Sequence, residues 1–137
     1  MTSIVIIAHT PIASALLAGV HHVFPDAQQV YTYDVLPADD SDLLVKRILS
    51  QLGQELEHSQ VLLFSDLIGA TPSNIAVRVV QDLREQEREA ELLTGTNICM
   101  LLSAVRYRDM PLAQLQTKVI EAGQRGMQSI DCDFQAQ

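Results

Sequence analysis

The fold is decided by the apolar stretch Ser3-Ile-Val-Ile-Ile-Ala8, which stands close to the beginning of the chain. The stretch is too short for a helix, rich in β-branched residues, and apolar at almost every position rather than at every second one. This pattern is typical of a strand that is buried on both faces inside a parallel sheet. A second stretch of the same kind, Gln60-Val-Leu-Leu-Phe-Ser65, follows further along. We therefore expect both to be central strands of one parallel sheet.

Amphipathic segments alternate with these strands. Apolar residues recur at helical spacing within residues 12–23, 45–56, 76–83 and 112–119, and two more strand-like runs lie at 29–34 and 90–94. Asn97 is placed to cap another helix, from Ile98 to about Tyr107. This alternation predicts an α/β fold with helices on both faces of a mainly parallel sheet. Residues 127–134 are expected to supply a final short strand.

The composition fits one compact domain over residues 1–137, because a typical domain has about 150 residues. Hydrophobic residues make up 47% and charged residues 19% of the chain, which excludes general disorder. Acidic residues outnumber basic ones by 17 to 9, so the net charge is −8. A nucleic-acid partner is not expected, because such binding needs a basic patch.

The N-terminal segment lacks the features of a secretory signal. No Lys or Arg precedes the first apolar stretch, and His9 and Pro11 end it. No segment approaches the roughly 20 apolar residues of a membrane helix. We therefore expect a cytoplasmic protein that is not inserted into a membrane.

The two cysteines and three of the four histidines could take part in metal or redox chemistry, but we expect them to be structural. Cys99 and Cys132 lack metal-ligand spacing, and Cys99 lies in an apolar run, where a buried thiol is the simpler interpretation. His21 and His22 end a predicted helix, where a cation suits the helix dipole, and His58 lies in a polar stretch. No metal ion or dissociable cofactor is expected.

A histidine and an aspartate follow the two central strands directly. His9 ends the first apolar stretch, and Asp66 ends the second. Considered without its neighbours, a single histidine at a strand end is most simply interpreted as a hydrogen-bonded core residue. In a parallel sheet, however, ligands gather outside the carboxyl ends of the strands, where these two residues would emerge side by side. A carboxylate bonded to one imidazole nitrogen leaves the other lone pair exposed and stabilises positive charge on the ring, which predicts a nucleophilic histidine.

The loop that follows the second strand has the features of a phosphate site. Gly69 allows the backbone to approach a ligand closely, and Thr71-Pro72 predicts an N-cap followed by proline at the first helical position. The N–H groups of Ser73 and Asn74, with the Thr71 hydroxyl, are expected to face the strand ends and bind an anion. A nucleophilic histidine beside such a loop suggests a phosphohistidine.

These residues resemble the mannose-type enzyme IIA family of the bacterial phosphoenolpyruvate:sugar phosphotransferase system. The resemblance runs from residue 4 to residue 130 and is most specific in Ile4-Val-Ile-Ile-Ala-His9, Asp66-Leu-Ile-Gly-Ala-Thr-Pro-Ser-Asn-Ile-Ala76 and Gly95-Thr-Asn-Ile-Cys-Met100. It implies a flavodoxin-like three-layer αβα sandwich. It also implies an antiparallel C-terminal edge strand that pairs across a homodimer.

The resemblance further implies a phosphotransferase that works without metal or cofactor. His9 would be the phosphorylated residue, Asp66 its partner, and Thr71 the hydroxyl that contacts the phosphoryl group. The histidine phosphocarrier protein HPr would donate the phosphoryl group and a IIB component would accept it. The chain departs from the common family pattern at the rim of the site, where Thr10 replaces a glycine and Ile68 an aromatic residue, so the departures concern docking more than chemistry.

Three other functions fit some of the same residues. A regulatory phosphohistidine protein without its own sugar permease would use the same site. An aspartyl-phosphate receiver would need an acidic pair after the first strand, where Ala8-His9-Thr10 stands instead. A hydrolase built on Ser65 or Ser73 would lack the G-x-S-x-G elbow.

Overall fold

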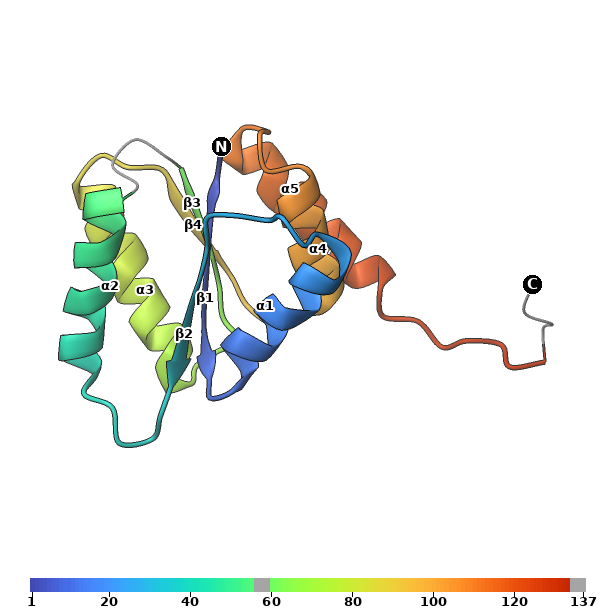
Figure 1. The fold of residues 1–137 in the computed structure, drawn as a ribbon, viewed down its shortest axis with the longest axis horizontal. Coiled ribbons are helices and arrows are strands. Elements are labelled where there is room, and N and C mark those ends of the chain that lie inside the picture. Colours follow the sequence, from blue (N-terminus) through green and yellow to red (C-terminus); the bar gives the residue numbers. More distant parts are fainter. Residues whose placement is uncertain (56–59, 134–137) are drawn as a thin grey trace.

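The computed structural model describes residues 1–55 and 60–133 (Figure 1). Within them the elements follow in the order β1 (Ser3–His9), α1 (Ile12–Val23), β2 (Val30–Val35), α2 (Ser41–Glu55), β3 (Val61–Phe64), α3 (Thr71–Glu85), β4 (Ala90–Leu93), α4 (Ile98–Arg106) and α5 (Leu112–Arg125). Each strand predicted from the apolar runs is found, and its ends lie within one residue of those expected. Position 56, the predicted end of the second helix, lies outside the described residues.

The strands form one parallel sheet in the order β2-β1-β3-β4. β1 is central, because Ile4 lies opposite both Val30 of β2 and Leu62 of β3. β3 is buried along its whole length, and β1 is buried up to its last residue, His9. The prediction that the two apolar stretches are neighbouring strands of a parallel sheet is confirmed.

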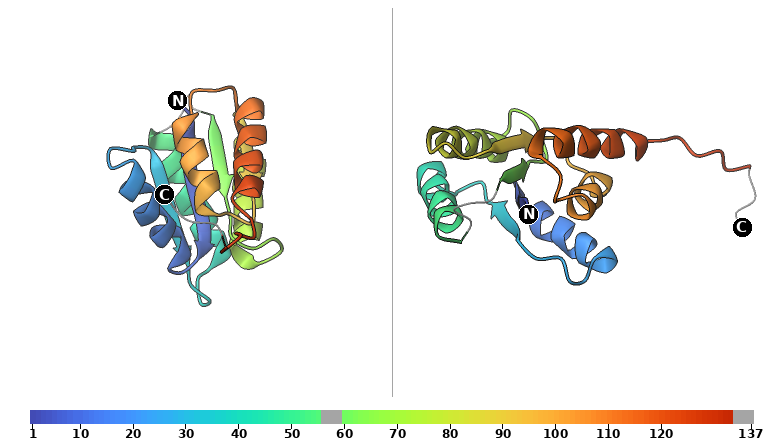
Figure 2. Two further views of the ribbon diagram at one scale, coloured as in Figure 1. Left: turned by 90° about the vertical axis from the view of Figure 1, so that its right-hand side faces the viewer. Right: turned by 90° about the horizontal axis from the view of Figure 1, so that it is seen from above.

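Helices cover both faces of the sheet, as the two views of Figure 2 show. Successive residues of β1 point to opposite faces, as strand geometry requires. Val5 and Ile7 pack into a core with residues of α2 and α3. Ile4 and Ile6 pack into a second core with residues of α1, α4 and α5. The predicted three-layer α/β fold is therefore confirmed.

The C-terminal segment differs from the prediction. α5 ends at Arg125 with Gly126 at its C-cap, and residues 127–133 contain no strand. In Figure 1 this segment leads away from the body of the molecule, so its backbone does not reach an edge of the sheet. Met127 and Ile130 are accordingly 69% and 68% exposed. The expected strand over residues 127–134 is thus not formed within the chain, and residue 134 lies outside the described part.

Asn97 caps α4 by accepting the Met100 N–H at 3.0 Å, as predicted. Cys99 lies against the C-terminal end of α5 as a free thiol, and it is half-buried rather than fully buried as predicted. His21 and His22 lie in the last turn of α1, whereas His58 lies outside the described residues. No helix in the described part of the chain is long and apolar enough to cross a membrane.

Candidate functional site

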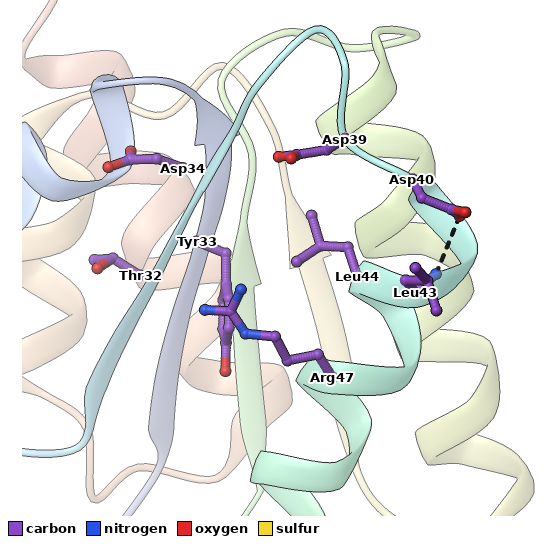
Figure 3. Close-up of a pocket in the computed structure, with 8 residues that line it drawn as sticks. All are labelled: Thr32, Tyr33, Asp34, Asp39, Asp40, Leu43, Leu44 and Arg47. Carbon is purple, nitrogen blue, oxygen red and sulfur yellow. Dashed lines mark hydrogen bonds between the residues drawn. The ribbon is translucent and has the colours of Figure 1, made fainter.

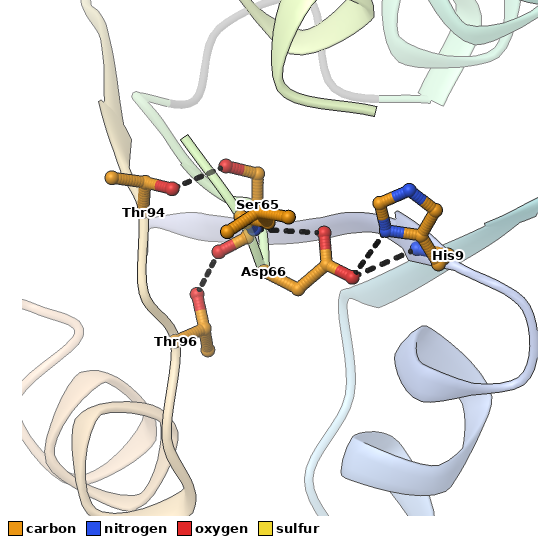
Figure 4. A network of polar contacts seen from close by, with 6 residues as sticks. His9, Ser65, Asp66, Thr94 and Thr96 are labelled. Atoms are coloured by element: carbon orange, nitrogen blue, oxygen red, sulfur yellow. Dashed lines mark hydrogen bonds and ion pairs between the residues drawn. The ribbon is translucent and has the colours of Figure 1, made fainter. Parts of the chain in front are cut away.

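His9 and Asp66 meet at the carboxyl end of the sheet (Figure 4). His9 is the last residue of β1, and Asp66 follows β3, the parallel neighbour of β1. Asp66 Oδ2 lies 2.8 Å from His9 Nδ1 and also accepts the His9 backbone N–H at 3.1 Å. Its other oxygen, Oδ1, accepts the Leu67 N–H at 3.0 Å. The structure therefore brings together the two residues singled out by their positions after the strands.

The charge state of Asp66 determines which ring nitrogen is free. Burial acts to raise the pKa of Asp66, but the hydrogen bonds from the His9 ring and backbone and the attraction of the imidazole outweigh burial, so the pKa lies below its usual value of 3.8. An ionised carboxylate only accepts hydrogen bonds, so Nδ1 carries the proton and donates it. Nε2 then holds the lone pair, and Figure 4 shows this nitrogen turned away from Asp66.

The two side chains differ in their contact with solvent. The His9 side chain is 45% exposed, whereas that of Asp66 is 12% exposed. The carboxylate therefore lies behind the ring, and Nε2 is open to an incoming group. A histidine in this arrangement can act as a nucleophile toward a group brought by a second molecule.

The N-terminus of α3 differs from the prediction by one position. Ala70 is the N-cap, because its carbonyl accepts the first helical hydrogen bond from the Asn74 N–H at 3.0 Å. Thr71 is thus the first helical residue rather than the cap, and the Asn74 N–H is not free to bind a ligand. The first turn still offers the backbone N–H groups of Thr71 and Ser73, while Pro72 has none. Thr71 is exposed and Ser73 is buried.

Four helices begin at this edge of the sheet, and their N-termini are treated differently. The first turns of α1, α2 and α4 donate N–H groups to the side chains of Asp34, Asp40 and Asn97, respectively. The N-cap of α3 is Ala70, which offers no side-chain acceptor, and in the described part of the chain no other side chain accepts from this turn. The positive end of the α3 dipole is therefore not capped by a side chain of the described residues, and a helix end of this kind can bind an anion.

Gly69 lies in the loop between Asp66 and α3. Its φ of +81° is in the left-handed region, where glycine is favoured over other residues. A Cβ built there would meet no atom within 4 Å, so the space beside the loop is open. Conformation and open space together fit the predicted close approach of a ligand to this backbone.

Sequence reasoning gave no role to the polar contacts of the neighbouring loop, between β4 and α4. The Ser65 carbonyl accepts the Thr96 hydroxyl at 2.7 Å and the Thr96 N–H at 3.2 Å, and the Ser65 hydroxyl donates to Thr94 Oγ1 at 3.0 Å (Figure 4). The only sequence signal was that residues 95–100 belong to a stretch shared with the enzyme IIA family. These contacts hold the residue that directly precedes Asp66.

A cavity of about 440 Å³ lies beside β2 and α2, separate from His9 and Asp66. Figure 3 shows its lining: Thr32, Tyr33, Asp34, Asp39, Asp40, Leu43, Leu44 and Arg47. Its three carboxylates already accept backbone N–H groups, those of Asp34 and Asp40 in helix first turns and that of Asp39 from Leu36. The Arg47 guanidinium lies 5.8 Å from the centre of the Tyr33 ring. The cavity is thus built from residues that hold local structure.

Metal-ligating side chains do not gather at the site. Within residues 1–55 and 60–133, no group of three His, Cys, Asp or Glu residues is arranged to hold a metal ion. What the described arrangement offers is a nucleophilic nitrogen, a shielded carboxylate and an uncapped helix N-terminus. These groups suit the transfer of an anionic group such as a phosphoryl.

Solved structures of other proteins share this fold. The mannose/sorbose-specific IIA subunit of the phosphotransferase system from Enterococcus faecalis aligns with a TM-score of 0.85 at 18% identity, over 98% of each chain. The EIIA component from Streptococcus agalactiae aligns with a TM-score of 0.80 at 23% identity, over 94% of this chain and 97% of that one. The fold is therefore that of phosphotransferase-system IIA proteins.

Sequence comparison identifies the family. A family model described as "PTS system fructose IIA component" matches residues 3–120, and the chain belongs to this EIIA-man family. The mannose-specific EIIAB component of the phosphotransferase system from Escherichia coli K12 is 27% identical over 130 residues. The match covers 93% of this chain and 39% of that protein, so the chain spans about two-fifths of its length. The resemblance inferred from the motifs is confirmed.

Proposed function

We propose that this chain is a phosphocarrier: His9 accepts a phosphoryl group from the histidine phosphocarrier protein HPr and passes it to a IIB component. The observation that carries the proposal is the 2.8 Å contact of His9 Nδ1 with Asp66, which leaves Nε2 exposed beside the uncapped N-terminus of α3. Membership of the EIIA-man family supports the same role. Residues 1–137 would act as one IIA domain in the cytoplasm.

The proton on Nδ1 of His9 determines how the phosphoryl group would be transferred. The Nε2 lone pair of His9 forms a bond to phosphorus while the P–N bond of the donor phosphohistidine breaks, and that electron pair remains on the donor ring. The His9 ring then carries a proton on Nδ1 and the phosphoryl group on Nε2, so it is positively charged. The Asp66 carboxylate stabilises this charge from a position that is set before the reaction begins. Transfer to the acceptor reverses these bond changes with a new nucleophile.

The loop and first turn after Asp66 would hold the phosphoryl oxygens. Thr71 would contribute its hydroxyl and N–H, and Ser73 its N–H, at the positive end of α3. Gly69 would allow the loop to lie close to the phosphoryl group. Asn74 would contribute through its exposed side chain alone, since its N–H is bonded to Ala70.

Exposed apolar side chains at the same edge support docking of another protein rather than of a small substrate. Leu36 follows β2, and Leu67 and Ile68 follow β3, so all three flank the strand ends near His9. Ile68 is 76% exposed, and the other two are more than half exposed. Large apolar side chains grouped around a polar site are typical of protein-binding surfaces.

A homodimer is proposed as the assembled form. β4 lies at one edge of the sheet, where its outer N–H and C=O groups have no strand partner among the described residues. Residues 127–133 leave the body with Met127 and Ile130 exposed. If each protomer added its C-terminal segment as a strand beside β4 of the other, the symmetric interface would cover both the β4 edge and the exposed apolar residues of the segment. Sedimentation equilibrium tests this: the full chain should be a dimer, and a chain ending at Gly126 should be monomeric or unfolded.

The carrier role is tested by following one phosphoryl group through two transfers. The chain is first loaded with radiolabelled phosphoenolpyruvate, enzyme I and HPr, then repurified and mixed with a mannose-type IIB protein. A carrier loses its label to IIB in stoichiometric amount. A chain that loads but retains its label with IIB proteins present would support the regulatory alternative, and a chain that never loads would overturn both.

A further inference from the structure

The loop between β4 and α4 makes polar contacts with Ser65, the residue directly before Asp66. The carbonyl of Ser65 receives two hydrogen bonds from one residue: the Thr96 hydroxyl at 2.7 Å and the Thr96 N–H at 3.2 Å. The Ser65 N–H donates to the Leu93 carbonyl at 2.9 Å, which continues the pairing of β3 with β4. Both backbone groups of Ser65 are thus fixed by the neighbouring segment.

The loop that supplies these contacts is itself held in place. Gly95 has a φ of +64°, a left-handed conformation that places a bend in the backbone between Thr94 and Thr96. Asn97 then caps α4 and donates through Nδ2 to the Gly123 carbonyl of α5 at 3.1 Å. Because Asn97 is tied to two helices, Thr96 contacts Ser65 from a fixed position.

The orientation of the Ser65 carbonyl decides where Asp66 lies. Ser65 is fully buried and immediately precedes Asp66, so rotating its peptide plane would displace the Asp66 side chain. That side chain accepts two hydrogen bonds from His9 through a single oxygen, Oδ2. A small displacement would therefore lengthen both contacts, and a shift of about 1 Å at such a site can cost about 100-fold in rate.

We propose that Thr96 is a positioning residue for the phosphoryl-transfer site. Its hydroxyl holds the Ser65 carbonyl, and thereby keeps Asp66 at the distance at which it fixes the proton on His9 Nδ1. The consequence for transfer rests on the proposed phosphocarrier function. The consequence for the histidine ring does not, because the His9–Asp66 contact exists without a phosphoryl group.

The test compares substitutions that remove or retain one hydroxyl. Thr96→Val keeps the shape and the N–H but loses the hydroxyl, Thr96→Ala loses it without the β-branch, and Thr96→Ser retains it. Thr94→Val is the matched control, because the Thr94 hydroxyl contacts the Ser65 hydroxyl and not its carbonyl. Histidine labelled with ¹⁵N reports which ring nitrogen of His9 carries the proton, and phosphoryl loading from HPr reports the transfer rate.

In Thr96→Val and Thr96→Ala, the His9 ring signals should move toward those of a mixture, with the proton on Nδ1 in some molecules and on Nε2 in others. Phosphoryl loading should slow by about tenfold, because the loss of one hydrogen bond changes a rate by up to about that factor. The HPr concentration that gives half the maximal rate should change little. Thr96→Ser and Thr94→Val should both match the wild-type chain. Rescue by serine separates positioning from a packing effect of the threonine methyl group.

Two results would overturn the proposal. The first is an unchanged His9 ring signal in both Thr96→Val and Thr96→Ala. The second is an equal change in Thr94→Val, which would mean that any disturbance of this loop has the same effect. A wild-type chain that accepts no phosphoryl group would instead contradict the phosphocarrier function, and the ring signals would still decide the role of Thr96.

Discussion

The two ends of the central strand β1 hold polar side chains in opposite ways. At its carboxyl end, the His9 ring makes one contact with Asp66 and is 45% exposed. At its amino end, Arg108 is 7% exposed, and its guanidinium donates four hydrogen bonds to the backbone. The acceptors are the carbonyls of Thr2, Gln28 and Gln29, at 2.6 to 3.1 Å.

This difference separates a group that holds the fold from a group that can react. Burial lowers the pKa of Arg108, while Asp109 and Tyr31 oppose the change, and an arginine remains charged at neutral pH all the same. Its donors pair with the carbonyl of the fully buried Thr2 and with those of Gln28 and Gln29, so it ties the start of β1 to the segment that leads into β2. At the other end, Nε2 of His9 is left open, and the helix N-terminus beside it is uncapped. The groups that are free to bind another molecule, Nε2 and the N–H groups of the helix N-terminus, thus lie at the carboxyl end of the sheet.

The largest effect is expected at the carboxyl end, from Asp66→Asn. An amide can hold the ring but cannot stabilise a positive charge on it, so phosphoryl transfer should slow by up to roughly four orders of magnitude, as for the orienting carboxylate of a catalytic triad. The urea midpoint of unfolding should fall by a small amount, so the loss of transfer rate should far exceed the loss of stability. Rapid-quench measurement of loading from HPr provides the rate, and a wild-type rate would reduce Asp66 to a structural residue.

At the amino end, Arg108→Met should lower the stability of the chain and leave phosphoryl transfer intact. Removing the guanidinium takes both side-chain donors from the carbonyl of the buried Thr2, which should lower the free energy of unfolding by about 2 kcal/mol. The transfer rate per folded molecule should be unchanged. Urea unfolding is the measurement, and Arg106→Met is the control, because Arg106 is exposed and only lies over the Tyr107 ring. Equal losses in the two variants would contradict the assigned role of Arg108.

The two ends should also respond differently to acid. The folded-state pKa of Asp66 is lower than its unfolded value, so its stabilising contribution is present above about pH 4 and is lost as the pH falls through the folded-state value. The stability difference between wild type and Asp66→Asn should therefore shrink below about pH 4. The difference between wild type and Arg108→Met should not follow this trend, because arginine does not titrate there. Urea unfolding series at several pH values would show whether the two differences separate.

The smallest expected effect concerns the loop at the reactive end. Gly69→Ala places a side chain at a φ of +81°, which should destabilise the chain by about 1 kcal/mol and slow phosphoryl loading. Gly53→Ala is the matched control, because a Cβ at either glycine meets no atom within 4 Å and Gly53 lies within α2. In the control, alanine should stabilise the helix by up to about 1 kcal/mol. If both substitutions stabilise, the left-handed conformation of Gly69 is not required.

The carboxyl end of the sheet could be predicted from the sequence because its signals are local. Runs that are apolar on both faces mark β1 and β3, and a polar residue that directly follows such a run lies at the strand end. His9 and Asp66 were found in this way. The start of α3 was misplaced by one residue, because threonine and alanine compete for the cap and only the backbone hydrogen bond to Ala70 decides between them.

The amino end could not be predicted, since its contacts join distant parts of the chain. Arg108 reaches Thr2 across 106 residues, and no periodicity or spacing announces such a pair. The Thr96 contact with Ser65 spans 31 residues and was missed for the same reason. The C-terminal strand was wrong for another reason, because residues 127–133 lead away from the sheet and pair with no strand of their own chain.

The central claim is that His9 is the nucleophile, and intact mass measurement tests it most directly. After incubation with phosphoenolpyruvate, enzyme I and HPr, the wild-type chain should gain a single phosphoryl group that is labile in acid and stable in base. His22→Ala, which alters an exposed histidine in the last turn of α1, should gain the same mass. His9→Ala should gain none, and loading of His9→Ala to the wild-type level would contradict the account.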